Sequence, residues 1–474
     1  MKMYNTMTGV KEDFIPISDN VIKMYVCGPT VYDFCHIGHA RAGIVFDTIR
    51  RYLEYRFPEK RIVFITNFTD IDDKMIKRAN EEGVTVFELA NRFINQYFKD
   101  FDALNIKRAS YYPRATEHIP DMIKFIEKLI ELGFAYETDG SVYFNIVKFE
   151  TYGKLSHKKL EELQPSEEED ISIQKRSPYD FALWKKRKEN EPYWDSPWGP
   201  GRPGWHIECS TMSMKYLGDT FDIHGGGLDL VFPHHENEIA QSEALTGNKF
   251  VNFFIYNNYV TINGEKMSKS LGNFFTIEEI LQKYPPMALR FFLLTIHYRS
   301  PINFSEDQII QAKSTFSKIE LALAYAEQRK LSSVPSDQLS DELEENIQTT
   351  TQEFFDAMDD DFSTPKAVAS INTLARHLNR LATLEEDVRP ETLEKAHDTL
   401  LELCYILGLV EQPKLSQEQN IINRLMDIIV TLRNEARNLK QYEISDKIRD
   451  QLKELGINFI DYANWTVWIK ELKA

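Results

Sequence analysis

Two histidines and two lysines have the types and spacing needed to handle phosphate. His36 and His39 belong to the tetrapeptide HIGH, where an apolar stretch gives way to a helical pattern, and Lys266 and Lys269 belong to the polar segment KMSKS. A helix start offers free N–H groups and a positive end, and two imidazoles on one turn can donate hydrogen bonds to charge developing on an α-phosphate. Lysine, a mobile point charge, suits a departing pyrophosphate. Together these segments predict a split ATP site with these four residues as catalytic groups.

Glycines near these segments predict close approach of a nucleotide to the backbone. Gly28 and Gly38 flank the histidine segment, and His224 is followed by Gly225, Gly226 and a third glycine. Because glycine lacks a Cβ atom, a ligand can come near the chain there. We expect an adenosine or amino-acid pocket. The predicted ATP-binding residues are Gly28, Gly38, His39, Gly225, Gly226 and Lys269, and His224 is predicted to bind substrate.

A thiol, an imidazole and a carboxylate suggest a metal site. His234 and Glu238 are four residues apart and share one face if the segment is helical, while Cys209 and Cys27 add thiolates. These are the ordinary donors of zinc, so the predicted ligands are Cys27, Cys209, His234 and Glu238. His235 competes for the site, but a regular helix would turn it about 100° away. The alternative is that His234 packs or caps and Glu238 lies on the surface.

Composition indicates a globular chain in a reducing compartment. The 474 residues are 42% hydrophobic, contain no apolar run of eighteen, and include four cysteines, too few for a disulfide framework. We therefore expect a cytoplasmic location and no membrane partner. The net charge of −17 argues against nucleic acid. However, the acidic excess is uneven, because residues 335–361 alone hold ten acids and no Lys or Arg, whereas 421–474 hold nine basic residues against eight acidic ones. The net charge therefore does not exclude a nucleic-acid-binding surface in the C-terminal part.

The order of the expected elements indicates an α/β fold. Val21–Val26 and Arg61–Thr66 are predicted strands, and His39–Tyr55 and Asp70–Asn80 are predicted helices, the second capped by aspartates. This alternation favours a parallel sheet. Between the two parts of the sheet we expect a helix at 115–132, a strand at 141–146, a mobile acidic loop at 161–170 and an ordered loop at 176–205. The sheet should resume with strands at 220–224 and 253–260. From residue 306 the chain should be mainly helical, with helices at 417–440 and 443–455 and a final strand at 465–469.

Six segments resemble the cysteinyl-tRNA synthetases of bacterial type. They are CGPTVYD (27–33), HIGH (36–39), GRPGWHIEC (201–209), HGGG (224–227), FPHHENEIAQ (232–241) and KMSKS (266–270). HIGH and KMSKS are typical of all class I synthetases, whereas the zinc-bearing segments are similar to those of the cysteine enzymes. The resemblance covers nearly the whole chain.

The resemblance implies the domain plan and the ligands. It implies a Rossmann-type parallel-sheet catalytic domain (1–111 and 201–305), an inserted connective domain (112–200), a stem-contact region and helical bundle (306–410), and an anticodon-binding domain (411–474). It also implies one Zn²⁺ on the four donors, Mg²⁺ with ATP, and a monomer that binds tRNA(Cys) and L-cysteine. Cys27, Thr69 and Trp205 would bind cysteine and Lys269 would contact ATP. Arg433, Arg437, Asp446 and Arg449 would face the anticodon.

In such an enzyme, the cysteine carboxylate attacks the α-phosphate of ATP and displaces pyrophosphate, and a terminal ribose hydroxyl of tRNA then attacks the adenylate and takes the cysteinyl group as AMP leaves. An apolar pocket discriminates poorly between near-isosteres such as cysteine and serine. Zinc would therefore select cysteine by bonding its thiolate, which a neutral serine hydroxyl cannot replace. Two rivals remain: a cysteine ligase that uses the same adenylate with an amino-sugar acceptor, and a non-catalytic zinc protein that binds tRNA. The helical region from 306 argues against the first, and the paired ATP segments argue against the second.

Overall fold

The computed structural model describes most of the chain in two compact units. The described residues are 1–159, 175–262, 264–266, 274–329, 334–384, 387–411, 417–462 and 465–470. Unit 1 comprises Met1–Thr261, Glu265–Ile277 and Tyr298–Ile302, and unit 2 comprises Ile262–Gly264, Glu278–His297 and Asn303–Ala474. Strands β11 (Val260–Ile262), β12 (Glu265–Lys266) and β13 (Ile302–Phe304) and the short helix α7 (Ile277–Leu281) lie in the stretches where the chain passes between the units.

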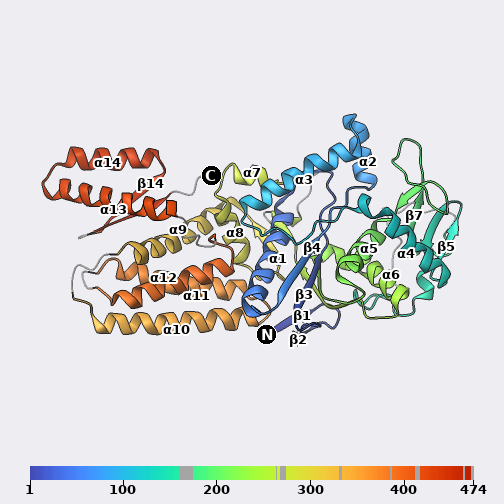
Figure 1. The fold of residues 1–474 in the computed structure, drawn as a ribbon, viewed down its shortest axis with the longest axis horizontal. Helices are drawn as coiled ribbons and strands as arrows, with labels where there is room; N and C mark the ends of the chain where they lie inside the picture. The colour runs from blue at the N-terminus through green and yellow to red at the C-terminus, as the bar shows by residue number, and fades with distance from the viewer. Residues whose placement is uncertain are drawn as a thin grey trace. The chain divides into compact units, whose positions relative to one another are not determined.

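A parallel four-stranded sheet forms the centre of unit 1 (Figure 1). Its strand order is β10–β9–β3–β4, with β3 at Val21–Val26, β4 at Arg61–Thr66, β9 at Phe221–Gly227 and β10 at Val251–Asn257. Side chains such as Ile22, Met24, Ile65 and Ile223 are fully buried in it. The predicted α/β class, the parallel sheet and the bounds of the first two strands are confirmed.

Helices connect and cover these strands. Helix α1 (Ile37–Arg56) joins β3 to β4 as a βαβ unit, and α2 (Asp73–Glu82) begins at the N-cap Asp72, whose side chain accepts from Met75 N at 2.7 Å. The predicted aspartate cap is therefore confirmed, although the helix starts three residues later than expected. The other helices of this part are α3 (Val86–Ala103), α5 (Trp205–Leu217) and α6 (Glu236–Thr246), and β1 (Lys2–Asn5) and β2 (Val10–Asp13) form an N-terminal hairpin.

The segment expected as an insertion has its own sheet. Its elements are α4 (Ile119–Glu131), β5 (Ala135–Thr138), β6 (Ser141–Phe144) and β7 (Phe181–Lys186). The sheet has the order β5–β6–β7–β8, and its last strand β8 (Gly201–Pro203) lies just beyond the expected boundary at residue 200. The prediction of a loop throughout 176–205 is wrong, because Phe181, Leu183 and Trp184 bury apolar side chains in β7 despite the surrounding Pro and Gly. The predicted acidic loop at 161–170 lies outside the described residues.

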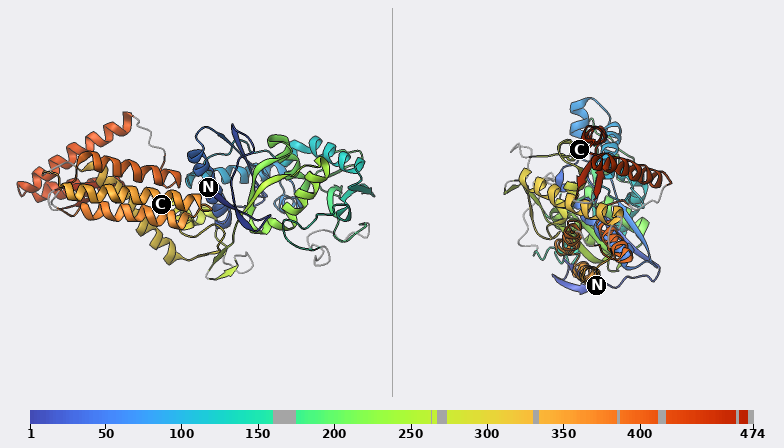
Figure 2. Two further views of the ribbon diagram at one scale, coloured as in Figure 1. Left: turned by 90° about the horizontal axis from the view of Figure 1, so that it is seen from below. Right: turned by 90° about the vertical axis from the view of Figure 1, so that its left-hand side faces the viewer.

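Unit 2 is mainly helical, as predicted. It contains α8 (Pro286–Leu294), α9 (Glu306–Gln328), α10 (Asp337–Asp359), α11 (Thr364–Leu381), α12 (Pro390–Ile406), α13 (Gln417–Asn438) and α14 (Tyr442–Glu454). Helices α9 to α12 lie side by side as a bundle (Figure 2). The acidic stretch 335–361 largely forms α10, and Cys404 on α12 is buried. The terminal strand β15 (Thr466–Lys470) pairs with β14 (Ile457–Asp461), which the sequence patterns did not reveal. No described helix combines the length and apolar character needed to cross a membrane.

Candidate active site

The first turn of α1 fixes both histidines of the HIGH segment. His36 is the N-cap, its Nδ1 accepts from Gly38 N at 3.0 Å, and His39 Nδ1 accepts from His36 N at 3.2 Å. The two rings stack with centroids 3.8 Å apart, so they point the same way, as predicted. Because Nδ1 accepts in both, each neutral ring carries its proton on Nε2.

Burial keeps both imidazoles neutral. It lowers the pKa of His36 from 6.5 to about 4. Burial, and then the neighbouring His36, lowers the pKa of His39 well below its ordinary value. The pair can therefore donate Nε2–H hydrogen bonds to phosphate oxygens near neutral pH without carrying charge.

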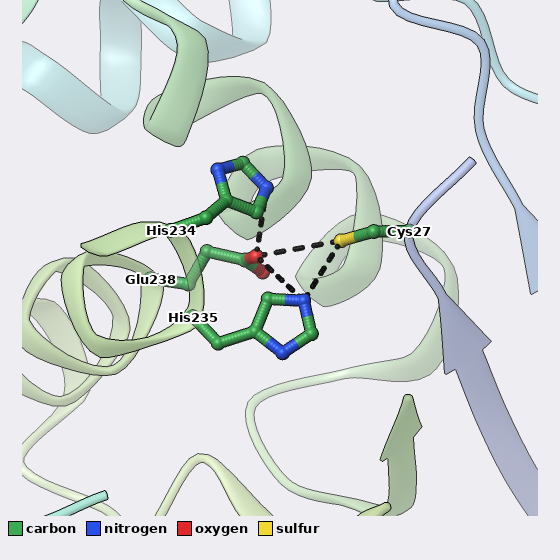
Figure 3. Close-up of side chains that lie close together, drawn as sticks. All are labelled: Cys27, His234, His235 and Glu238. Carbon is green, nitrogen blue, oxygen red and sulfur yellow. Dashed lines mark hydrogen bonds and ion pairs between the residues drawn. The ribbon is translucent and has the colours of Figure 1, made fainter. Parts of the chain in front are cut away.

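Side chains that could hold a metal ion converge where β3 ends and α6 begins, and we call them the metal-binding group (Figure 3). Donor atoms of Cys27, His234, His235 and Glu238 all lie within 4.8 Å of one another. Glu238 Oε1 is 3.1 Å from His234 Nε2 and 3.5 Å from Cys27 Sγ. The expectation that His234 and Glu238 share a face is confirmed, and both are buried.

Cys209 lies beside this group, and His235 lies within it. The Sγ atoms of Cys27 and Cys209 are 3.6 Å apart, while His235 Nε2 is 3.3 Å from Cys27 Sγ. The expectation that His235 points away is wrong, because Val231–His235 forms a π-helical turn with a non-helical Phe232, and regular helical angles do not apply there. Cys209 as the fourth ligand stays a prediction.

The chemistry of these donors fits a soft divalent cation such as zinc. Burial, followed by the hydrogen bond to Cys209, raises the pKa of the Cys27 thiol well above its ordinary value. A buried carboxylate gathered with thiols and imidazoles is costly unless a cation balances it. Thiolate, imidazole and carboxylate form the usual donor set of zinc.

A second layer of polar contacts orients the donors. His224 Nε2 lies 2.9 Å from Glu238 Oε2, His206 Nδ1 lies 2.9 Å from His234 Nδ1, and Tyr256 Oη lies 2.7 Å from His235 Nδ1. His224, predicted to bind substrate, is thus buried behind Glu238. Such outer contacts fix the orientation of metal ligands.

One cavity of about 580 Å³ in unit 1 brings the predicted sites together. Of the predicted residues, those that line it are Cys27, Gly28, His36, Gly38, His39, Thr69, Trp205, Cys209 and His234. The ring of Trp205 stacks on His234 with centroids 4.1 Å apart. The histidine pair and three of the predicted metal ligands, Cys27, Cys209 and His234, therefore line one cavity, large enough for a nucleotide and an amino acid.

Glu208 is a buried carboxyl at this site that sequence reasoning did not single out. Thr69 Oγ1 donates to Glu208 Oε2 at 3.1 Å, and burial, followed by the nearby Asp70, raises the pKa of Glu208 well above its ordinary value. Its position directly before Cys209 was the available signal.

Local packing accounts for the glycines. A Cβ on Gly28 would lie 1.7 Å from the carbonyl oxygen of Asn67, and one on Gly225 would lie 2.3 Å from the ring of Phe46. A Cβ on Gly226 would meet Leu230 at 2.8 Å. Protein atoms thus explain Gly225 and Gly226, and their contact with ATP stays a prediction. Lys266 lies in β12, and Lys269 is outside the described residues.

The predicted tRNA-binding residues lie on α13 and α14 and differ in exposure. The side chain of Arg433 is 2% exposed and bonded to both oxygens of Asp461 at 2.7 and 2.8 Å. Arg437 also contacts Asp461, at 2.9 Å, and Arg449 pairs with Asp446 at 3.1 Å. The enclosure of Arg433 disfavours a direct contact with tRNA, whereas Arg437, Asp446 and Arg449 are exposed.

Comparison with known proteins first defines the class. Residues 13–314 match the family described as tRNA synthetases class I (C) catalytic domain, and residues 353–411 match the DALR domain. Methionyl-tRNA synthetase of Mycobacterium tuberculosis in complex with methionyl-adenylate has a similar fold, with a TM-score of 0.59 and 14% identity over 82% of this chain and 90% of that one. The chain therefore has the catalytic domain of a class I aminoacyl-tRNA synthetase.

Full-length relatives then give the family. A cysteine–tRNA ligase of Caldicellulosiruptor saccharolyticus is 53% identical over 98% of this chain and 99% of the relative. One of Thermococcus onnurineus is 48% identical over 99% and 98%. The chain belongs to the cysteine–tRNA ligase family and is an aminoacyl-tRNA synthetase.

Proposed function

We propose that the protein activates L-cysteine with ATP, releases pyrophosphate, and transfers cysteine from the adenylate to the 3′ end of tRNA(Cys). The main support is one cavity that is lined both by the His36–His39 pair and by Cys27, Cys209 and His234 of the candidate metal ligands. Magnesium would accompany ATP. The family assignment supports the same substrates. The proposed enzyme is a cytoplasmic monomer.

In the first step, the residues of the chain mainly position ATP and cysteine and stabilise the charge that builds on the phosphate. The Nε2–H groups of His36 and His39 donate to phosphate oxygens as negative charge builds on the α-phosphate. Lys266 and Lys269 are assigned to the leaving pyrophosphate. Trp205 and Thr69, which line the cavity, are assigned to the amino acid.

Zinc held by Cys27, Cys209, His234 and Glu238 would supply a soft Lewis acid that accepts a thiolate in preference to a neutral hydroxyl. The chain's own part is to hold the donors. His224 and His206 fix Glu238 and His234 through the oxygen and nitrogen atoms that face away from the donor group.

The four predicted regions keep their roles in this proposal. Residues 1–111 with 201–305 carry catalysis, 112–200 form the connective insertion, 306–410 contact the tRNA stem, and 411–474 bind the anticodon. The exposed Arg437, Asp446 and Arg449 on α13 and α14 support the last assignment.

Amino-acid-dependent ATP–pyrophosphate exchange tests the proposal. Exchange should be at least about a hundredfold more efficient with cysteine than with serine, and purified tRNA(Cys) should become charged with cysteine. Equal exchange with both amino acids would contradict zinc selection. Exchange without transfer to tRNA would instead favour the amino-sugar ligase.

A further inference from the structure

Arg41, two residues after His39 on α1, is a fully buried cation that binds main-chain oxygens. Its Nη1 donates to the carbonyls of Asn258 at 2.9 Å and Tyr259 at 2.6 Å. Its Nη2 donates to the carbonyls of Tyr298 at 3.3 Å and Ser300. Burial lowers the pKa of Arg41 to about 10, so the side chain remains charged near neutral pH.

These carbonyls belong to two segments that also bond to each other. Asn258 N donates to Tyr298 O at 2.8 Å, and Ile302 N donates to Tyr259 O at 3.0 Å. One planar guanidinium with five N–H donors can hold several carbonyls at once, which a compact ammonium cannot do. Arg41 therefore fixes the position of both segments against α1.

The first of these segments is a wall of the cavity. Residues 257–260 line it, and Tyr259 is 42% exposed. From α1, Gly38, His39 and Ala42 line the same cavity. Arg41 thus connects two walls of one cavity, the start of α1 and residues 257–260, through its hydrogen bonds to Asn258 and Tyr259. Burying a charge is costly, so such a contact must be offset by strong hydrogen bonds.

We propose that Arg41 is a positioning residue for the nucleotide, holding residues 257–260 at the spacing from His36 and His39 that ATP requires. This inference rests on the proposed function, because it takes ATP as the ligand of that part of the cavity. Arg41 touches no reacting atom and acts through the carbonyls of Asn258 and Tyr259. The amino-acid end, at Cys27 and Trp205, does not depend on it.

The test compares Arg41→Met and Arg41→Lys with the wild-type chain in pyrophosphate exchange. In Arg41→Met the KM for ATP should rise about tenfold, as expected when a binding wall shifts by a fraction of an ångström. The KM for cysteine should stay within about twofold. In Arg41→Lys the KM for ATP should lie between the values of the wild-type chain and of Arg41→Met. In Arg41→Ala, added guanidinium at millimolar concentration should partly restore the KM for ATP.

Arg290→Met is the matched control. Arg290 is also fully buried and donates to a main-chain oxygen, that of Leu407 at 2.9 Å, but it lies in unit 2. This variant should lose stability without a change in the KM for ATP.

The inference would be overturned by an unchanged KM for ATP in Arg41→Met, by equal changes in both KM values, or by the same ATP effect in Arg290→Met. If Arg41→Met does not fold, Arg41→Lys decides by the same criteria. Absence of exchange in the wild-type chain would count against the proposed function itself.

Discussion

His224 Nε2 lies 2.9 Å from Oε2 of Glu238, and this contact leaves the other carboxylate oxygen facing Cys27 and His234. The imidazole is fully buried and its Nδ1 lies 3.2 Å from the carbonyl of Tyr25. The contact with His224 therefore fixes the orientation of the Glu238 carboxylate.

Replacing His224 with Gln should loosen the metal without removing a ligand. Outer-layer substitutions typically cost about 10- to 100-fold in metal affinity, so zinc should pass to a colorimetric chelator faster by that order. His297→Gln is the control, because His297 contacts Asp361 in unit 2. Wild-type release rates in His224→Gln would show that Glu238 does not need this support.

The fourth zinc ligand can be assigned by substitution. Cys209→Ser should release zinc, because a thiolate is a strong soft donor and a hydroxyl is not. His235→Gln should retain it, since zinc in such sites is ordinarily four-coordinate and Cys27, Cys209, His234 and Glu238 would fill the four positions. Zinc content of the purified variants, measured by mass spectrometry, checks both. The reverse pattern would make His235 the ligand and Cys209 its neighbour.

His36 should make stability depend on pH. Burial lowers its pKa from 6.5 to about 4, so the folded chain binds fewer protons than the unfolded chain between these values. The contribution of His36 to the free energy of unfolding is therefore fully present above about pH 6.5 and is lost as the pH falls toward 4. The loss between about pH 7 and pH 4.5 should be on the order of 2 kcal/mol.

His36→Asn isolates this effect, because Asn caps helices well but does not titrate. The variant should match the wild type in denaturant unfolding near pH 7 and fall less on acidification. Its exchange kcat should drop, since the Nε2 donor is gone. Identical pH profiles of stability would assign the acid sensitivity to other groups.

Sequence patterns predicted the parts of the site that depend on local geometry. The 36/39 and 234/238 spacings bring their side chains together, as predicted. They do so although His36 is an N-cap and His234 lies in a π-helical turn, because each pair is only three or four residues apart. The parallel sheet followed from the alternation of strands and helices. The family assignment followed from several short segments considered together.

Features set by tertiary packing could not be predicted. The π-helical turn at Val231–His235 brings His235 into the donor group, and nothing in the spacing signals that turn. Gly225 suggested a nucleotide, but its neighbour is Phe46, 179 residues earlier in the chain. Strand β7 was hidden by the Pro and Gly around it, and β14 became recognisable only through its pairing with β15.

Arg433 and Arg449 should separate stability from tRNA binding in the C-terminal region. Arg433 is enclosed, and its hydrogen bonds are the main reason that the pKa of Asp461 falls to about 2. Arg433→Ala leaves the partly exposed Asp461 with Arg437 and the Thr466 hydroxyl, which should cost about 2 kcal/mol. Arg449 is about half exposed, and its pairs with Asp446 and Asp450 are surface contacts. Arg449→Ala should therefore change stability by less than about 0.5 kcal/mol.

The same two variants should diverge in tRNA binding. In Arg449→Ala the KM for tRNA should rise and, if the contact is to phosphate, the salt dependence of binding should become shallower by about one counterion. Pyrophosphate exchange should be unchanged in both variants, since all segments assigned to ATP and zinc end by Ser270. Thermal unfolding, exchange and aminoacylation measured on the same preparations check this. Equal loss of exchange and aminoacylation in Arg449→Ala would mean that α14 supports the fold, and its assignment to the anticodon would have to be dropped.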